Sequence, residues 1–210
     1  MFIPIGDDNS RLRKFPLVVW IILGLNCWIW FKQLTLGESF TTGYSIIPYE
    51  ITHGIDLIKD RSIHISGERV VIPHSPGPDP IYLTLISAMF MHGSWMHLLG
   101  NMLYLMIFGD QIEDRLGHIK FIIFYLICGL SASAAQILLD PASLIPNLGA
   151  SGAIAGILGG YLILHPNNSV RVIVFRSIVY LPAIIVLGAW FALQFLGQFG
   201  SAGGSFGVAY

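Results

Sequence analysis

Three polar side chains, those of His97, Asn101 and Ser151, lie inside long apolar stretches of this chain. His97 and Asn101 are four residues apart, so a helix would place them on one face, one turn from each other. Both can donate hydrogen bonds toward a common point, where they could stabilise negative charge developing on a carbonyl oxygen. The simpler alternative is that the pair forms polar contacts between helices, worth about 0.6 kcal/mol on average. Because polar groups are costly in hydrocarbon, we favour a catalytic role.

Ser151 stands between Gly149 and Gly152, just after a Pro-Asn pair at 146–147, where a turn should pass into a helix. Its hydroxyl and the unpaired backbone N–H groups of the first turn would share the positive end of the helix dipole. Such a position suits a nucleophile beside an oxyanion site. Taken alone, Ser151 could equally be a helix N-cap. The segment lacks the second glycine of G-x-S-x-G, so the nucleophile elbow of soluble hydrolases is not matched.

Other residues near these two motifs are expected to support them. His92 precedes His97 by five positions and is offset by about 140° on a helical wheel, which favours a hydrogen-bonding support over catalysis. Gly152 begins a glycine repeat at every fourth residue, which predicts close packing of another helix. Glu113 and Arg115 should form a local, structural pair where the second span ends. The remaining histidines have no ligand-like spacing, so neither a metal nor a cofactor is expected.

The composition is that of an integral membrane protein. Hydrophobic residues make up 54% of the chain and charged residues 11%, against roughly 25% charged in soluble domains. The mean hydropathy is +0.70. A net charge of −1 with scattered basic residues excludes an electrostatic footprint for nucleic acid. The partner that the composition implies is therefore the lipid bilayer.

Apolar runs predict where the elements that carry these residues cross the membrane. A polar cytoplasmic N-terminal tail at 1–14 is followed by one transmembrane domain at 15–210, with spans near 15–31, 95–109, 121–139, 148–164 and 178–199. Basic residues before the first span and between later spans all fall on one side, which the positive-inside rule makes cytoplasmic. The 32–91 segment is an outer loop, and its apolar run at 81–91 is too short to span and should be partly embedded.

The combination of His92, His97 and Asn101, then Glu113-x-Arg115-x-Gly117, then Gly149-x-Ser151-Gly152, resembles the rhomboid intramembrane serine proteases. The resemblance implies an all-α membrane protein with a bundle of six transmembrane helices, about five of them complete here. It also implies an integral, multi-pass location, most simply the cell (inner) membrane, with the active site open to the outer side. The partners implied are transmembrane helices of substrate proteins.

In that family the serine matching Ser151 attacks the peptide carbonyl, and the residues matching His97 and Asn101 bind the oxyanion. The general base is a histidine on the sixth helix, which is expected beyond Tyr210, so we predict that 210 residues is a truncated form. A catalytically silent relative that binds transmembrane helices is the alternative reading. A transporter or channel is disfavoured because no repeated halves are present.

Overall fold

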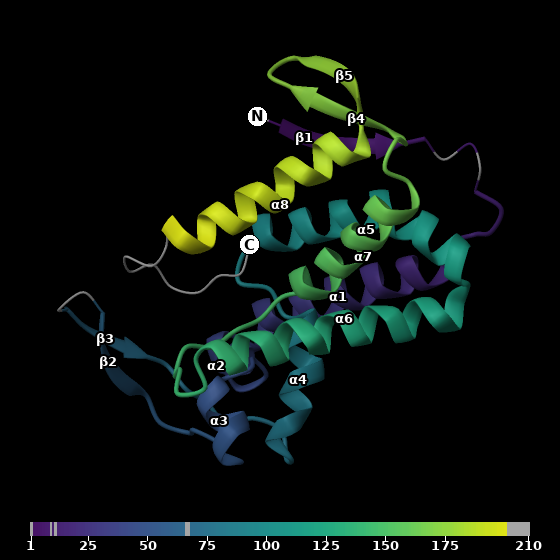
Figure 1. Cartoon of the computed structure of the whole chain (residues 1–210). Helices are drawn as coiled ribbons and strands as arrows, with labels where there is room; N and C mark the ends of the chain where they lie inside the picture. The colour runs from purple at the N-terminus through teal and green to yellow at the C-terminus, as the bar shows by residue number, and fades with distance from the viewer. Residues whose placement is uncertain (1, 9, 11, 66–67, 201–210) are drawn as a thin grey trace.

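The computed structural model describes residues 2–8, 10, 12–65 and 68–200, and most of them are helical. Helix α1 (Leu17–Leu36) and helix α6 (His118–Leu139) are long and apolar enough to cross a membrane. Helix α5 (Trp95–Leu116) matches them in length but carries several charged residues in its last two turns. In Figure 1 these three helices run side by side, and α1 contacts both of the others.

Helix α7 (Ser151–Leu164) packs against α5 and α6 through the predicted glycine face. A Cβ added at Gly152 would lie 2.5 Å from the Cβ of Ala132, and one at Gly160 would lie 3.4 Å from the ring of Phe124. Between them, Gly156 faces Cys128 in the same way. Residues four apart on α7 therefore meet residues four apart on α6, and the predicted close helix contact is confirmed.

Two predicted spans end too early. The first span, placed at 15–31, continues to Leu36, and the second, placed at 95–109, continues to Leu116. In both cases the helix continues through polar residues beyond the predicted end. Gln33 and Asp110 are buried in the structure, so they belong to the packed part of each helix.

The predicted fifth span was wrong at its start. Residues Ser177–Pro182 form strand β5, and the apolar helix α8 begins only at Ala183 and runs to Gly200. Strand β5 pairs with β4 (Ser169–Val174), which pairs in turn with β1 (Phe2–Asp7). Val170 and Val172 of β4 are buried and alternate with exposed positions, a pattern that favours a strand over a helix.

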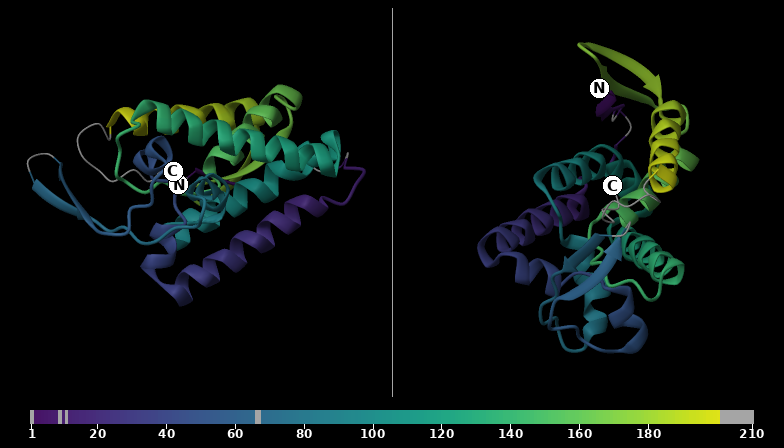
Figure 2. Two further views of the ribbon diagram at one scale, coloured as in Figure 1. Left: turned by 90° about the horizontal axis from the view of Figure 1, so that it is seen from below. Right: turned by 90° about the vertical axis from the view of Figure 1, so that its left-hand side faces the viewer.

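This sheet also bears on two broader expectations. The N-terminal segment 1–14 contains strand β1, which is paired with β4. The fold is mostly helical, but it is not strictly all-α. In Figures 1 and 2 the sheet lies at one edge of the bundle, beside the start of α8.

The 32–91 segment contains short elements. Helices α2 (Glu38–Gly43) and α3 (Pro48–His53) precede a hairpin of β2 (Arg61–Ile65) and β3 (Glu68–Ile72). Three single turns follow: η1 (Ile81–Leu83), α4 (Thr84–Ser87) and η2 (Ala88–Phe90). The last turn contacts α1 and α7, and its Met89 is 2% exposed. Its packing places the chain directly before His92 against the bundle.

The far end of α5 is tied to α1 by a buried carboxylate. Glu113 accepts hydrogen bonds from the backbone N–H groups of Val18 and Val19, both at 2.8 Å. It also pairs with the ring of His118. The expected local pair between Glu113 and Arg115 is absent among the described residues, because the carboxylate satisfies the first turn of α1 instead.

Candidate active site

The start of α5 positions two of the three predicted site residues. Ser94 caps this helix, since its hydroxyl accepts a hydrogen bond from the backbone N–H of His97 at 3.1 Å. His97 therefore lies in the first turn and Asn101 one turn later. Both side chains are buried, with 8% and 9% of their surfaces exposed. The helix presents them together, as their spacing predicts.

The contacts of the His97 ring decide which of its nitrogens can act as a donor. The backbone N–H of Gly93 donates a long hydrogen bond, 3.5 Å, to Nδ1 of His97. A nitrogen that accepts a hydrogen bond carries no proton in neutral imidazole, so this contact favours the tautomer with the proton on Nε2. That Nε2 is buried and has no hydrogen-bond partner among the described residues. His97 thus holds a donor that the folded chain leaves unused.

His92 lies behind this pair and contacts Asn101. The Asn101 amide Nδ2 donates to Nε2 of His92 at 3.0 Å, which fixes the orientation of the Asn101 side chain. The His92 and His97 rings meet edge to face, with their centroids 5.1 Å apart. His92 is therefore placed where it orients both neighbours.

Gln33, which no sequence pattern singled out, forms hydrogen bonds with the backbone of His92. Gln33 of α1 accepts a hydrogen bond from the backbone N–H of His92 at 3.0 Å and donates one to its carbonyl oxygen at 2.9 Å. The side-chain amide thereby pairs with both backbone groups of one residue, 59 positions along the sequence. A buried glutamine at the end of an apolar run could have revealed it, but the predicted span stopped before that position.

Ser151 is the first residue of α7, and Gly149 separates it from His97. The helix is preceded by Ala150, so Ser151 is not its N-cap. Gly149 has a φ of +132°, a conformation that L side chains rarely adopt, and its N–H donates to the Ala88 carbonyl at 2.8 Å. A Cβ added at Gly149 would lie 2.9 Å from Nε2 of His97 and 3.5 Å from Oγ of Ser151. The nucleophile candidate and the unused donor therefore face the same small space.

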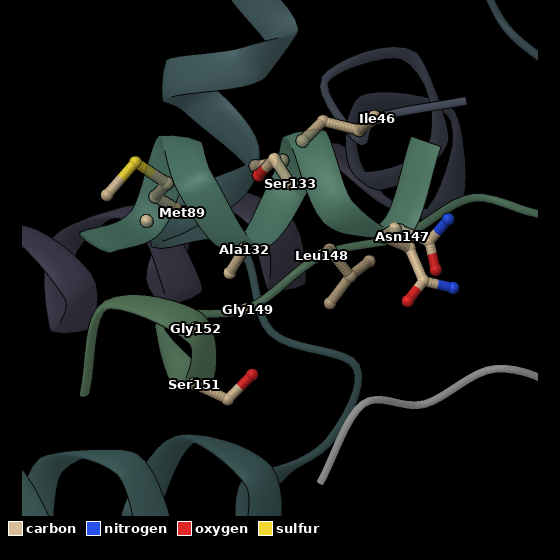
Figure 3. A pocket seen from close by; sticks show the side chains of 12 residues that line it. Ile46, Met89, Ala132, Ser133, Asn147, Leu148, Gly149, Ser151 and Gly152 are labelled. Atoms are coloured by element: carbon tan, nitrogen blue, oxygen red, sulfur yellow. The ribbon is translucent and has the colours of Figure 1, made fainter. Parts of the chain in front are cut away.

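A cavity of about 140 Å³ adjoins this space (Figure 3). Ala132 and Ser133 of α6 line one side, and Gly149, Ser151 and Gly152 line the other. Met89 lies at one end of the cavity and Asn147 near the other. Ser151 thus borders a mainly apolar cavity large enough for a small side chain.

The predicted residues divide into two groups in space. His97 and Ser151 lie beside Gly149, and His92 contacts both His97 and Asn101. Gly152 contributes to the contact with α6, while Glu113 and Arg115 lie at the other end of α5. No hydrogen bond to the Ser151 hydroxyl is formed by the part of the chain that the structure describes.

Residues 80–209, more than half of the chain, match the model of the rhomboid domain. The chain belongs to the rhomboid family. This match includes both the His92–Asn101 segment and the Gly149–Gly152 segment, so the residues brought together in the fold all lie inside the family domain. Family membership and the apolar helices together make this an integral membrane protein.

Several named relatives are similar over different lengths. The Bacillus subtilis rhomboid-family protein YdcA is 25% identical over 89% of this chain and 82% of its own. The rhomboid protease GluP of the same bacterium is 33% identical over 59% of this chain and 24% of its own. RHOMBOID-like protein 5 of Arabidopsis thaliana is 38% identical over 37% of this chain. That match covers only a quarter of the plant protein.

Proposed function

We propose that this rhomboid-family chain is the core of a serine endopeptidase that cleaves transmembrane segments of other membrane proteins within or beside the bilayer. The observation that carries the proposal is the space beside Gly149, which both the Ser151 hydroxyl and the unused Nε2–H of His97 face. A nucleophile and an oxyanion donor must converge on one carbonyl group, and this arrangement allows it.

The residues have separate roles in the proposed reaction. The Ser151 oxygen attacks the carbonyl carbon of the scissile peptide, and the carbonyl oxygen becomes an oxyanion. The Nε2–H of His97 and the Asn101 amide donate hydrogen bonds to that oxygen, and His92 orients Asn101. The Ser151 proton passes to a general base, then to the leaving amine, and water later hydrolyses the acyl-enzyme.

The general base is proposed to be a histidine beyond Tyr210, which is the position that the resemblance to the rhomboid proteases implies. His92 and His97 are occupied as support and donor, and His118 lies on Glu113 at the far end of α5. A serine hydroxyl without a base is a poor nucleophile, so the proposal depends on this residue. Intact mass of the protein from its natural membrane checks it, since a mass of 23.1 kDa would contradict a longer chain.

Ser151→Ala tests the nucleophile directly. We expect the variant to lose all cleavage of a single-span substrate in vesicles and all labelling by a fluorophosphonate probe, which reacts only with an activated serine. Ser133→Ala is the matched control, because Ser133 lines the same cavity and should keep both activities. Unchanged cleavage by the Ser151→Ala variant would refute the assignment.

The alternative is a silent relative that binds transmembrane helices. The two readings differ in one result. A silent protein would bind a single-span helix in vesicles with the same affinity before and after Ser151→Ala and would take up no fluorophosphonate. Labelling of the unmodified protein at Ser151 would exclude this alternative.

We further propose that the N-terminus is cytoplasmic and that the site opens to the outer side of the cell membrane. Basic residues support this orientation: Lys14, Arg115, Lys120 and Arg171 all belong to segments at the end where α1 begins. Reaction of a membrane-impermeant thiol reagent with Ser10→Cys and Ser39→Cys variants in intact cells checks it. Only the Ser39→Cys variant should react.

A further inference from the structure

One face of the β1–β4–β5 sheet is buried and the other is open. Val170 and Val172 of β4 are 0% exposed, and they pair with Leu181 and Val179 of β5 against the helices. On the open face, Ile3 pairs with Ile173 and Ile173 pairs with Ile178, so three isoleucines from three strands form one row. Ile178 is 59% exposed, and Tyr180 beside the row is 67% exposed. Antiparallel sheets that face water carry mainly polar residues on that side.

The tip of the β4–β5 hairpin has a second unusual feature. Phe175 has a φ of +54°, the left-handed conformation that Gly and Asn adopt with least strain. Its side chain is also 82% exposed. A large apolar residue is thus held in a strained conformation with its ring uncovered. The two-residue turn between Val174 and Ser177 requires a positive φ, and the paired strands hold Phe175 in it.

The charges around this face are basic. Arg176 follows Phe175 at the tip, and Arg171 lies on the open face opposite Tyr180. Among the described residues neither arginine forms an ion pair. Asp7 lies at the far end of the sheet, where it pairs with Val170, away from the tip. Arg171 lines a surface pocket with Asp7 and Asp8, whereas Arg176 lies at the tip. The open face therefore combines exposed apolar side chains with basic ones.

The sheet is fixed at the boundary of the membrane-spanning bundle. Strand β5 ends at Pro182 and α8 begins at the next residue, so the sheet is joined directly to an apolar helix. At the other edge, the Asp7 carboxylate accepts hydrogen bonds from Tyr161 of α7 at 2.6 Å and Gln111 of α5 at 2.7 Å. Figure 2 shows the β4–β5 hairpin projecting to one side of the helices, beside α8.

We propose that this open face, made of Ile3, Arg171, Ile173, Ile178 and Tyr180, together with the Phe175 tip, lies in the headgroup region of the adjoining leaflet and binds anionic lipid. Phe175 inserts among the acyl chains, and Arg171 and Arg176 bind lipid phosphates. The partner is the bilayer surface, because apolar side chains bordered by unpaired arginines match its acyl and phosphate layers. The proposal does not depend on proteolysis.

A nitroxide label tests the depth of the tip. The full protein carrying Phe175→Cys, with Cys27→Ser and Cys128→Ala removing the native thiols, is placed in vesicles of phosphatidylcholine with and without phosphatidylglycerol. We expect the label at 175 to be several-fold more accessible to oxygen than to an aqueous nickel complex when phosphatidylglycerol is present. A label at Ser10, which is exposed on the same side, should show the reverse.

A double substitution, Arg171→Gln with Arg176→Gln, tests the charges in the same assay. It should remove the difference between the two vesicle compositions while leaving the folded protein intact, since both arginines are unpaired. If the label at 175 is as accessible to nickel as the label at 10, the bilayer does not cover this face and the proposal is refuted. A protein partner would then be the remaining candidate for this face. Insertion that is equally deep without phosphatidylglycerol would refute the anionic-lipid site.

Discussion

At the scale of single residues, the site depends on the missing side chain at Gly149 as well as on the side chains of His97 and Ser151. Gly149 has a positive φ, and any side chain there would enter the space between the His97 ring and the Ser151 hydroxyl. The Nε2–H of His97 has no partner within the described chain, and we propose that it donates a hydrogen bond to a substrate oxygen in that space. Glycine at this position therefore allows the turn, and it also avoids a side chain that would enter the proposed oxyanion site.

Gly149→Ala is expected to lower the cleavage rate by about 10²-fold or more, the loss typical of removing one oxyanion donor, because the new Cβ displaces the His97 ring. Gly159→Ala is the control, since a Cβ there meets nothing within 4 Å. Cleavage of a single-span substrate gives the rate, and thermal unfolding shows whether the fold is retained. Wild-type cleavage by a folded Gly149→Ala variant would contradict this role.

At the scale of elements, α1 and α5 are tied at both ends by polar side chains that each reach the backbone of the other segment. Near the site, Gln33 of α1 holds the His92 peptide. At the opposite end, Glu113 of α5 accepts the N–H groups of Val18 and Val19. The first turn of α1 has no acidic residue of its own, so Glu113 supplies the missing cap and a favourable charge at the helix start.

Glu113→Ala should destabilise the protein by about 1 to 3 kcal/mol for each buried N–H group that loses its partner. We expect a lower unfolding temperature and faster hydrogen exchange at residues 17–20. Glu38→Ala provides the comparison, because Glu38 is exposed and should leave both measurements unchanged. Equal exchange at residues 17–20 in the two variants would show that the carboxylate is dispensable.

Gln33→Leu tests the tie at the other end of the same helix pair. Leucine keeps the apolar volume but removes both hydrogen bonds to the His92 peptide, so His92 and then Asn101 lose their orientation. We expect a lower cleavage rate and also a lower unfolding temperature, because the buried N–H and C=O of His92 lose their partners. Gln136→Leu, which lies beside the cavity, serves as the control for a glutamine substitution near the site. An unchanged rate in Gln33→Leu would limit this residue to a structural role.

At the scale of the whole molecule, the two ends of the bundle each contain a buried carboxyl group outside the spanning helices. Burial raises the pKa of Asp7 to about 6, although hydrogen bonds from Tyr161 and Gln111 oppose the shift. Burial likewise raises the pKa of Glu50 in α3 to about 7, although a hydrogen bond from the Leu57 N–H opposes it. The pKa of each carboxyl group is higher in the folded state than in the unfolded state, so protonation favours the folded state. Stability therefore falls as the pH rises from 3.8 to about 6 for Asp7 and from 4.5 to about 7 for Glu50.

The attachment of strand β1 should therefore strengthen as the pH falls from 7 toward 4, because protonated Asp7 is less costly to bury. Hydrogen exchange at residues 2–7, corrected for the intrinsic effect of pH, is expected to slow across this interval. Asp7→Asn should abolish the dependence, whereas Glu50→Gln should leave it unchanged at these residues. Faster exchange at lower pH would show that the sign is wrong.

The sequence by itself determined the membrane class, the placement of His97 and Asn101 on one helix face, the position of Ser151 and the glycine face of α7. These follow from composition and from spacings within one helix, which depend only on local geometry. The tertiary structure alone revealed that α6 packs on the glycine face, and it revealed the Gln33 tie, the Glu113 cap, the close approach of His97 to Gly149 and the β1–β4–β5 sheet. Each of these joins residues far apart in the chain, such as Asp7 and Tyr161, and no local pattern specifies which distant partner a buried polar group will find.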